Sequence, residues 1–571
     1  MSFTKVATYP CLPATTRGES TKLSASGDKV LYANGRTVVI RDLATPEIGI
    51  TYSGHVQPAT VARISPSGYY AASADAAGTV RVWDVAGSDQ TLKGEYKVLG
   101  GKLRDLAWDG ESKRIIAVGD GREKFGHAFM ADSGTSTGEI GGHSKAVNAV
   151  SIRAQRPFRA ATADDSGTIV FHTGVPFKYQ KTITTHTRFV QDVQYAPDGS
   201  TFVSVGSDYK VFLYDGQSGD TLGELGEGGK AHGGTIYAAA WAPTSSAFAT
   251  ASADGTVKYW DPATKASTRT ITIGSGVSNQ QVGAAWTARG VVSLSMSGDL
   301  NLLDDRTPGD KPALVLTGSQ KGITAGAAAE LVAGPGHTSQ VVGIAPLGGD
   351  GRAVSVGFDD CAREVKGAAG FTNTTVAIGG QPRDLSATSD ARPESAVIKD
   401  GQRVAQVKTD YDATSVAGGA GGVVAVGGQD NKIRLYDWKN GTLAPRTGTL
   451  EGNRGAVGAL AFTADGKLLA AGDSTGKIVV YDVATGTPSI TRWSFHSAKI
   501  ASLAWREDGL ALASGSLDTH VYVWSVSTPS KYVAIRNVAP GGCAAVAWRG
   551  SKEVVGAGAD ACVRVWSVEV P

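Results

Sequence analysis

Histidine, serine, threonine and aspartate are the residues of this chain whose types and recurrence could support chemistry. Six histidines each stand just before the predicted first strand of a repeat: His55, His143, His186, His232, His337 and His496. Histidines can ligate a metal ion or act as general bases, but both roles need side chains that converge on one point. One histidine to a repeat keeps them apart, so we expect structural roles.

The chain also lacks the motifs of common catalytic and nucleotide-binding sites. It contains no G-x-x-x-x-G-K-[ST], no G-x-S-x-G and no H-E-x-x-H. The glycines of 417–428, AGGAGGVVAVGG, are not followed by a helix pattern, which argues against a nucleotide site there. We therefore expect no enzymatic activity, no cofactor and no metal.

The segment 231–261, AHGGTIYAAAWAPTSSAFATASADGTVKYWD, contains the unit that the rest of the chain repeats. Ile236, Ala238 and Ala240 alternate with residues of the other face, as a half-buried strand requires. Asp254 and Gly255 suit a tight turn between two strands. With a histidine near its start and a Trp-Asp end, the segment has the pattern of a WD repeat, one four-stranded blade of a β-propeller.

Resemblance to WD-repeat proteins implies a set of hydrogen-bonded side chains that locks each blade. We expect such a set in three repeats: His186 with Ser204 and Asp208; His232 with Thr250, Asp254 and Trp260; His496 with Ser514, Asp518 and Trp524.

The position of the Trp-Asp aspartate recurs thirteen times: Asp42, Asp84, Asp132, Thr173, Asp215, Asp261, Asp304, Lys366, Asp400, Asp437, Asp482, Ser525 and Ser567. Most intervals match the roughly 40–45 residues of a propeller blade. Because one ring holds about 4–8 blades, thirteen repeats need two rings. The sequence thus predicts an all-β protein of two WD-repeat β-propellers in tandem with almost no helix. The first has seven blades over 10–320, and the second has six or seven over 321–571.

Two irregularities concern the second ring. The interval from Asp304 to Lys366 is 62 residues, so the second ring either has six blades or has lost about 30 residues of one repeat near 325. The last repeat, VRVWSVEVP, stops after its third strand, whereas SFTKVATYP at the other end has no ring partner. An open sheet edge would expose unpaired backbone groups. We therefore expect residues 2–9 to close the second ring, with 3–8 pairing with 562–567.

Composition limits the classes of partner. The net charge of +2, without a basic run, argues against a general nucleic-acid or membrane-surface binder. The four cysteines show no C-x-x-C spacing, so we expect free structural thiols in a reducing compartment. No apolar run approaches 18 residues, and the N-terminal residues lack the apolar core of a signal peptide. We expect a cytoplasmic monomer.

Four segments resemble the actin-interacting protein 1 family: GHVQPATVARISPSGYYAASADAAGTVRVWD (54–84), VGDGREKFGHAFMADSGTSTGEI (118–140), GVPFKYQKTITTHTRFVQDVQYAPDGS (174–200) and FHSAKIASLAWREDGLALASGSLDTHVYVW (495–524). The resemblance runs over nearly the whole chain. It implies a protein of the cortical actin cytoskeleton that binds actin filaments decorated by cofilin, promotes their severing and disassembly, and helps cap barbed ends. The alternative is a generic WD-repeat scaffold subunit of another complex.

Three segments of the first propeller are candidates for contact with actin or cofilin. GREKFGHAF (121–129) carries Arg122, Glu123 and Lys124 where a regular blade would have an apolar strand, and exposed loops on a rigid scaffold often carry function. Asp164 and Asp165 lie in the turn of ATADDSGT, where a purely structural acid is the simpler explanation. Phe177, Tyr179 and Phe189 could be core residues, but Pro176 and nearby lysines suggest that Phe177 and Tyr179 lie beside a loop, where an aromatic can anchor an interface.

The family resemblance selects four of these residues as contacts: Glu123, Asp164, Tyr179 and Phe189. They come from neighbouring repeats, so we expect them on one accessible side of the first propeller.

Overall fold

The computed structural model describes residues 2–321 apart from 47, 86–88, 227–228 and 307–308, and residues 410–570 apart from 440 and 441. Between 322 and 409 it describes the backbone of the strands β30–β35. The chain divides into two compact units, Pro10–Gln320 and Met1–Tyr9 with Lys321–Pro571. Four features named above lie outside the described residues: the truncated repeat predicted near 325, His337, Cys361 and Asp400.

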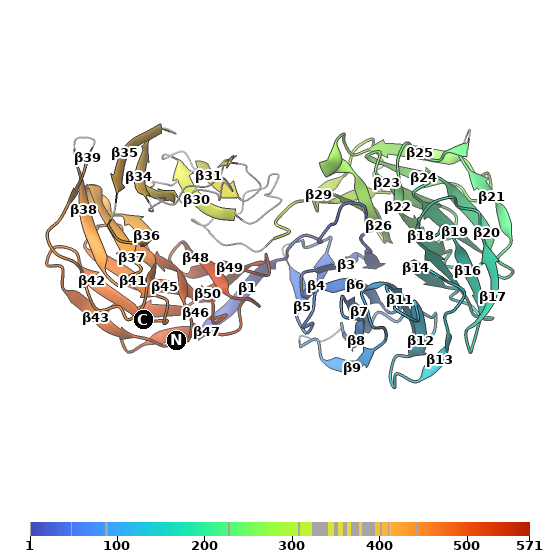
Figure 1. Ribbon diagram of the computed structural model, residues 1–571, viewed down its shortest axis with the longest axis horizontal. Helices are drawn as coiled ribbons and strands as arrows, with labels where there is room; N and C mark the ends of the chain where they lie inside the picture. Colours follow the sequence, from blue (N-terminus) through green and yellow to red (C-terminus); the bar gives the residue numbers. More distant parts are fainter. Residues whose placement is uncertain are drawn as a thin grey trace. The chain divides into compact units, whose positions relative to one another are not determined.

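Pro10–Gln320 forms seven four-stranded antiparallel sheets, drawn in blue to green in Figure 1. Their strands are, in chain order, β2 (Ser24–Ser26), β3 (Lys29–Asn34), β4 (Thr37–Asp42) and β5 (Gly49–Tyr52); β6 (Ala59–Ile64), β7 (Tyr70–Asp75), β8 (Thr79–Asp84) and β9 (Leu92–Lys97); β10 (Leu103–Trp108), β11 (Arg114–Gly119), β12 (Gly126–Met130) and β13 (Ser136–Glu139); β14 (Val147–Ile152), β15 (Arg159–Asp164), β16 (Ile169–Thr173) and β17 (Lys178–Ile183); β18 (Val190–Tyr195), β19 (Thr201–Gly206), β20 (Val211–Asp215) and β21 (Thr221–Leu225); β22 (Ile236–Trp241), β23 (Phe248–Ser252), β24 (Thr256–Trp260) and β25 (Ser267–Thr272); β26 (Gln281–Thr287), β27 (Gly290–Ser295), β28 (Leu300–Asp304) and β29 (Leu314–Leu316).

The seven sheets close into a ring, because the innermost strands of the first and last sheets, β2 and β26, contact each other. Apolar side chains fill the space between neighbouring sheets. Val203, Val211 and Leu225 of one sheet, for example, pack in one buried cluster with Ile236 and Trp260 of the next. Removal of this apolar surface from water is the main force that holds the sheets in a ring.

Polar bonds between inner strands add a second link. The carboxylate of Asp105 on β10 accepts a hydrogen bond from the backbone N–H of Val150 on β14 at 3.2 Å, and Asp192 on β18 accepts one from Ala239 on β22 at 3.1 Å. The buried ammonium of Lys22 bonds to Asp192 at 2.7 Å. These charges are compensated inside the ring, where an unpaired charge would be costly.

The described part of the second unit contains six sheets, in yellow to red in Figure 1, and β1 is in blue. The strands are β30 (Val341–Leu347), β31 (Arg352–Gly357) and β32 (Ala362–Lys366); β33 (Val376–Gly379), β34 (Glu394–Lys399) and β35 (Gln402–Lys408); β36 (Ala413–Gly418), β37 (Val423–Gly428), β38 (Ile433–Lys439) and β39 (Thr442–Pro445); β40 (Val457–Phe462), β41 (Leu468–Asp473), β42 (Ile478–Asp482) and β43 (Pro488–Trp493); β44 (Ile500–Trp505), β45 (Ala511–Ser516), β46 (Val521–Ser525) and β47 (Tyr532–Ile535); β48 (Cys543–Arg549), β49 (Glu553–Gly558) and β50 (Val563–Val568) with β1 (Phe3–Tyr9).

The strand β1 forms the outer edge of the last sheet, whose order is β1-β50-β49-β48. It pairs antiparallel with β50, from Phe3 opposite Val568 to Tyr9 opposite Val563. The N-terminal strand thus supplies the fourth strand that the last repeat lacks, and it covers the backbone groups of β50.

The predicted fold class, an all-β protein of two tandem β-propellers, is confirmed. Repeat ends predicted at Asp84, Asp215 and Asp304 are the last residues of β8, β20 and β28. Helical structure in the described residues is limited to short 3-10 turns such as Val277–Asn279 and Ala420–Gly422. None of the described helices is long and apolar enough to cross a membrane.

Candidate protein-binding surface

The histidines of the first propeller bond within single sheets. His232 Nδ1 lies 2.9 Å from Asp254 Oδ2, and its Nε2 lies 2.7 Å from Thr250 Oγ1, which also accepts the indole N–H of Trp260 at 2.8 Å. Burial raises the pKa of the Asp254 carboxyl, but hydrogen bonds from His232 and Thr256 outweigh it and hold that pKa well below its ordinary value. Such a histidine is engaged in structure and is not available for chemistry.

The other expected sets bond in the same way. His186 bonds to Asp208 at 3.0 Å and to Ser204 at 2.7 Å. In the second propeller, His496 lies 2.8 Å from Asp518 and 2.9 Å from Ser514, and Ser514 accepts the indole N–H of Trp524 at 2.8 Å. A further set, His55 with Ser73, Asp75 and Trp83, was not among those predicted. No three metal-ligating side chains are grouped anywhere in the described residues.

We call such a hydrogen-bonded set of His, Asp and Ser or Thr the lock of its sheet. The sheet β14–β17 has a variant of it. His143 Nδ1 lies 2.7 Å from Asp164 Oδ2, and its Nε2 lies 2.7 Å from Thr162 Oγ1. His172 stands where other sheets have tryptophan, and its Nε2 lies 2.9 Å from the same hydroxyl. The other ring nitrogen of His172 is buried without a hydrogen-bond partner. Burial, with a smaller effect of His143, lowers the pKa of His172 to about 3.

Asp164 therefore belongs to this lock, and the expectation that it is an accessible contact is wrong. Its side chain is 1% exposed. Besides His143, it accepts hydrogen bonds from the N–H and O–H of Ser166 at 2.8 and 2.5 Å and from the N–H of Thr168 at 3.1 Å. Burial alone would raise the pKa of Asp164, but these hydrogen bonds outweigh it and keep that pKa below its ordinary value.

Asp165, the next residue, lies at the surface. Its carboxylate accepts hydrogen bonds from Asn148 at 2.8 Å and from Arg104 at 3.1 Å, and the side chains of Arg104 and Asp165 are 29% and 26% exposed. Arg104 also pairs with Asp120 at 2.9 Å, directly before the turn that carries Glu123. Arg104 thus ties that turn to Asp165.

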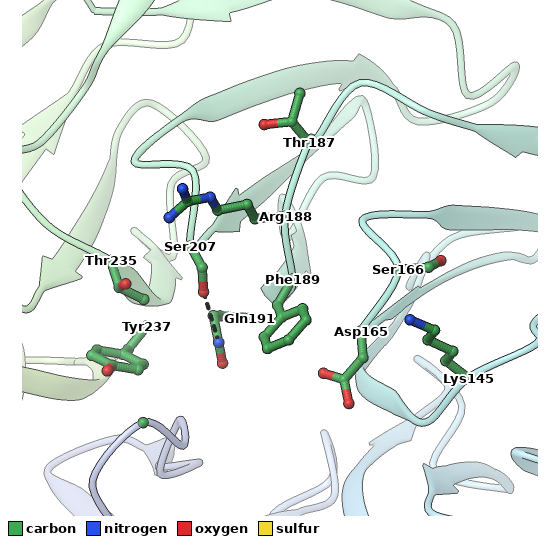
Figure 2. A pocket seen from close by; sticks show the side chains of 11 residues that line it. Lys145, Asp165, Ser166, Thr187, Arg188, Phe189, Gln191, Ser207, Thr235 and Tyr237 are labelled. Atoms are coloured by element: carbon green, nitrogen blue, oxygen red, sulfur yellow. Dashed lines mark hydrogen bonds between the residues drawn. The ribbon is translucent and has the colours of Figure 1, made fainter.

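A pocket of about 550 Å³ opens beside Asp165. It is lined by residues at one end of three consecutive sheets and by Gly18, which precedes β2 (Figure 2). The lining residues are Gly18, Lys145, Asp165, Ser166, Thr187, Arg188, Phe189, Gln191, Ser207, Thr235 and Tyr237. Lys145, Phe189 and Thr235 stand just before β14, β18 and β22, whereas Asp165 and Ser207 follow β15 and β19. All lie at the same end of their strands, and the sheets hold them rigidly.

Phe189 and Phe177 have opposite environments. The ring of Phe189 is 50% exposed at the pocket, and in Figure 2 it lies between Asp165 and Gln191. Phe177 is fully buried in a cluster with Ile116 and Phe158, so the expectation that it is an interface aromatic is wrong. The cause is a bridge between sheets: the N–H of Phe177 donates to the carbonyl of Thr137 at 2.8 Å, which draws the residue against the neighbouring sheet.

The remaining candidates are exposed but do not line the pocket. Arg122, Glu123 and Lys124 lie in the turn between β11 and β12, and Lys124 forms a long, exposed ion pair with Glu139 at 3.7 Å. Tyr179 on the outermost strand β17 is 52% exposed, and its hydroxyl bonds to Thr182 at 3.0 Å. Their joint role in one interface stays a prediction.

Sequence reasoning missed Lys145, Arg188 and Tyr237. Each lies immediately before or within the first strand of its sheet. Lys145 and Arg188 occupy corresponding positions, two residues before β14 and β18, and Tyr237 is the second residue of β22, as Gln191 is of β18. Such positions become neighbours when consecutive sheets pack side by side, and this was the signal that could have identified them.

The comparisons with known proteins agree with the fold. The family WD domain, G-beta repeat, matches residues 47–84, 177–215, 224–261, 445–482 and 487–525. Actin-interacting protein 1 of Drosophila melanogaster is 36% identical over 529 residues, 86% of each chain. WD repeat-containing protein 1 of Gallus gallus is 36% identical over 539 residues, again 86% of each, and that of Xenopus tropicalis is 35% identical over 530 residues, 86% of this chain and 87% of the relative. The chain belongs to the actin-interacting protein 1 family of WD-repeat proteins.

Proposed function

We propose that this protein binds actin filaments decorated by cofilin, promotes their severing and disassembly, and helps cap barbed ends at the cell cortex. The names of its relatives, which include actin-interacting protein 1, support actin as the partner. The observation that carries the proposal is the half-exposed ring of Phe189 beside Asp165 on the first propeller. An aromatic side chain held at a rigid pocket is the usual centre of a protein interface.

The contact surface that we propose has Phe189 as its apolar anchor and charged groups around it. Asp165 takes the place that the sequence assigned to Asp164, because only Asp165 lines the pocket. Glu123 extends the surface through the Asp120–Arg104–Asp165 contacts. Tyr179 forms its outer limit on β17. Charge complementarity would set the encounter rate, and the aromatics would supply most of the affinity.

Co-sedimentation with actin filaments, with and without cofilin, tests the proposal. Wild-type protein should pellet with filaments only when cofilin is present, and imaged filaments should sever faster. Phe189→Ala should weaken binding about 30-fold, the loss expected for an anchor residue worth about 2 kcal/mol. Leu222→Ala is the matched control, because Leu222 is 43% exposed on β21 but is not a pocket residue. Filament binding that does not depend on cofilin, or a Phe189→Ala protein that binds normally, would contradict the proposal.

A further inference from the structure

The pocket beside Phe189 has an unbalanced charge. Three positive side chains surround it: Lys145 and Arg188 line it, and Arg17 adjoins the lining residue Gly18. All three are exposed, and none has an ion-pair partner among the residues that the structure describes. Asp165, by contrast, is already paired with Arg104. The rim thus presents uncompensated positive charge.

The inner wall of the pocket is aromatic and carries one unused polar group. Tyr237 on β22 is 6% exposed, and within the described parts of the chain its hydroxyl has no hydrogen-bond partner. Burial raises the pKa of this phenol, and the charge of Arg17 offsets part of the rise. Solvent reaches this hydroxyl at the pocket, so a bound group can take the place of water as its hydrogen-bond partner.

We propose that this pocket receives an acidic segment of the protein partner, with one bulky apolar side chain against Phe189 and carboxylates beside Lys145, Arg188 and Arg17. The hydroxyl of Tyr237 donates a hydrogen bond to the same segment. The inference rests on the proposed function, in which that partner is the cofilin-decorated filament, and it adds the chemistry that the pocket selects. Buried aromatic surface gives the affinity, and the cationic rim excludes basic segments.

The test uses the full-length protein and cofilin-decorated actin filaments over a range of salt concentrations. Lys145→Gln with Arg188→Gln should weaken co-sedimentation about tenfold and make the affinity less dependent on salt, because rim charges act mainly on encounter. The matched control is Lys29→Gln with Lys113→Gln. It removes the same charge from exposed lysines at the starts of β3 and β11, at the opposite strand ends from the pocket, and it should bind normally.

Tyr237→Phe gives a second test, because a purely structural role of the hydroxyl would not affect binding to decorated filaments. Because the hydroxyl makes no bond inside the described part of the protein, its removal should leave the melting temperature unchanged. Binding to decorated filaments should nevertheless fall about fivefold, the effect of one lost hydrogen bond.

Three results would overturn the inference. If wild type binds decorated filaments and Lys145→Gln with Arg188→Gln binds equally well, the inference fails and the proposed function stands. If wild type shows no cofilin-dependent binding, both fail together. If calorimetry shows that inositol hexakisphosphate binds wild type and not the double variant, while filament binding is equal in the two, the pocket is a small-phosphate site.

Discussion

Alanine at Asp164 and at its neighbour Asp165 should have opposite consequences. Asp164 is 1% exposed and accepts four hydrogen bonds, from His143, from Thr168 and two from Ser166. Asp164→Ala leaves the buried His143 N–H without a partner, which costs about 1–3 kcal/mol, and removes turn bonds worth about 0.5–1.5 kcal/mol each. The sum over the three turn bonds and the histidine, about 2.5–7.5 kcal/mol, should lower the melting temperature by about 4–11 °C in a domain of this size.

Asp165→Ala should leave the fold nearly intact. Its partner Arg104 is partly solvated and keeps its ion pair with Asp120, and the buried Asn148 keeps its hydrogen bond to the carbonyl of Val190. A solvent-screened pair of this kind is worth less than about 1 kcal/mol. Calorimetry of the full-length variants measures the stabilities, and co-sedimentation with cofilin-decorated filaments well below the melting transitions measures binding. Only Asp165→Ala should bind weakly while melting normally, because it releases the Arg104 contact that ties the Glu123 turn to the proposed contact surface. Equal melting of Asp164→Ala and wild type would refute the assignment of Asp164 to the lock.

Three further predictions concern stability. The pKa of His172 is about 3 in the folded protein, against an ordinary 6.5. As the pH falls, His172 is therefore protonated in the unfolded chain before it is protonated in the folded protein. Stability present above pH 6.5 should therefore fall by about 2 kcal/mol by pH 5, and His172→Trp should flatten this slope in urea titrations from pH 5 to 8. Lys22→Met should cost about 3–5 kcal/mol because it leaves Asp192 buried without its cation, and adding Asp192→Asn should restore part of the loss in thermal melts. Deletion of residues 2–9 should speed hydrogen exchange of the β50 amides without changing those of β20, because it reopens one sheet edge.

The repeat pattern predicted the sheets because the third strand of a blade is buried on both faces and ends in a turn. TVRVWD forms β8, and β20 ends at the aspartate of KVFLYD, as expected. The β1–β50 pairing was predictable for a related reason, since an incomplete last repeat and an unmatched first segment leave one edge to fill. Counting the strands therefore predicted a pairing between the two ends of the chain, which the strand propensity of local residues cannot predict.

The same repeats contained the information that separates Asp164 from Asp165. The histidine and aspartate of the lock are 20–22 residues apart in four sheets: His55 and Asp75, His186 and Asp208, His232 and Asp254, His496 and Asp518. Asp164 is 21 residues after His143 and fits this spacing. A pair of adjacent acids can place only one carboxylate toward the histidine, so the spacing, rather than turn chemistry, identifies the buried one.

The environment of Phe177 could not be obtained in this way, because it depends on a bridge to Gly138 of the preceding sheet. Phe189 and Tyr237 form one pocket for a comparable reason. Each belongs to its own repeat and occupies an ordinary position at the start of an inner strand, and only the packing of β18 against β22 brings the two strand ends together. The lining of this pocket is therefore found by comparing the starts of consecutive inner strands, and not by looking for departures from the repeat pattern.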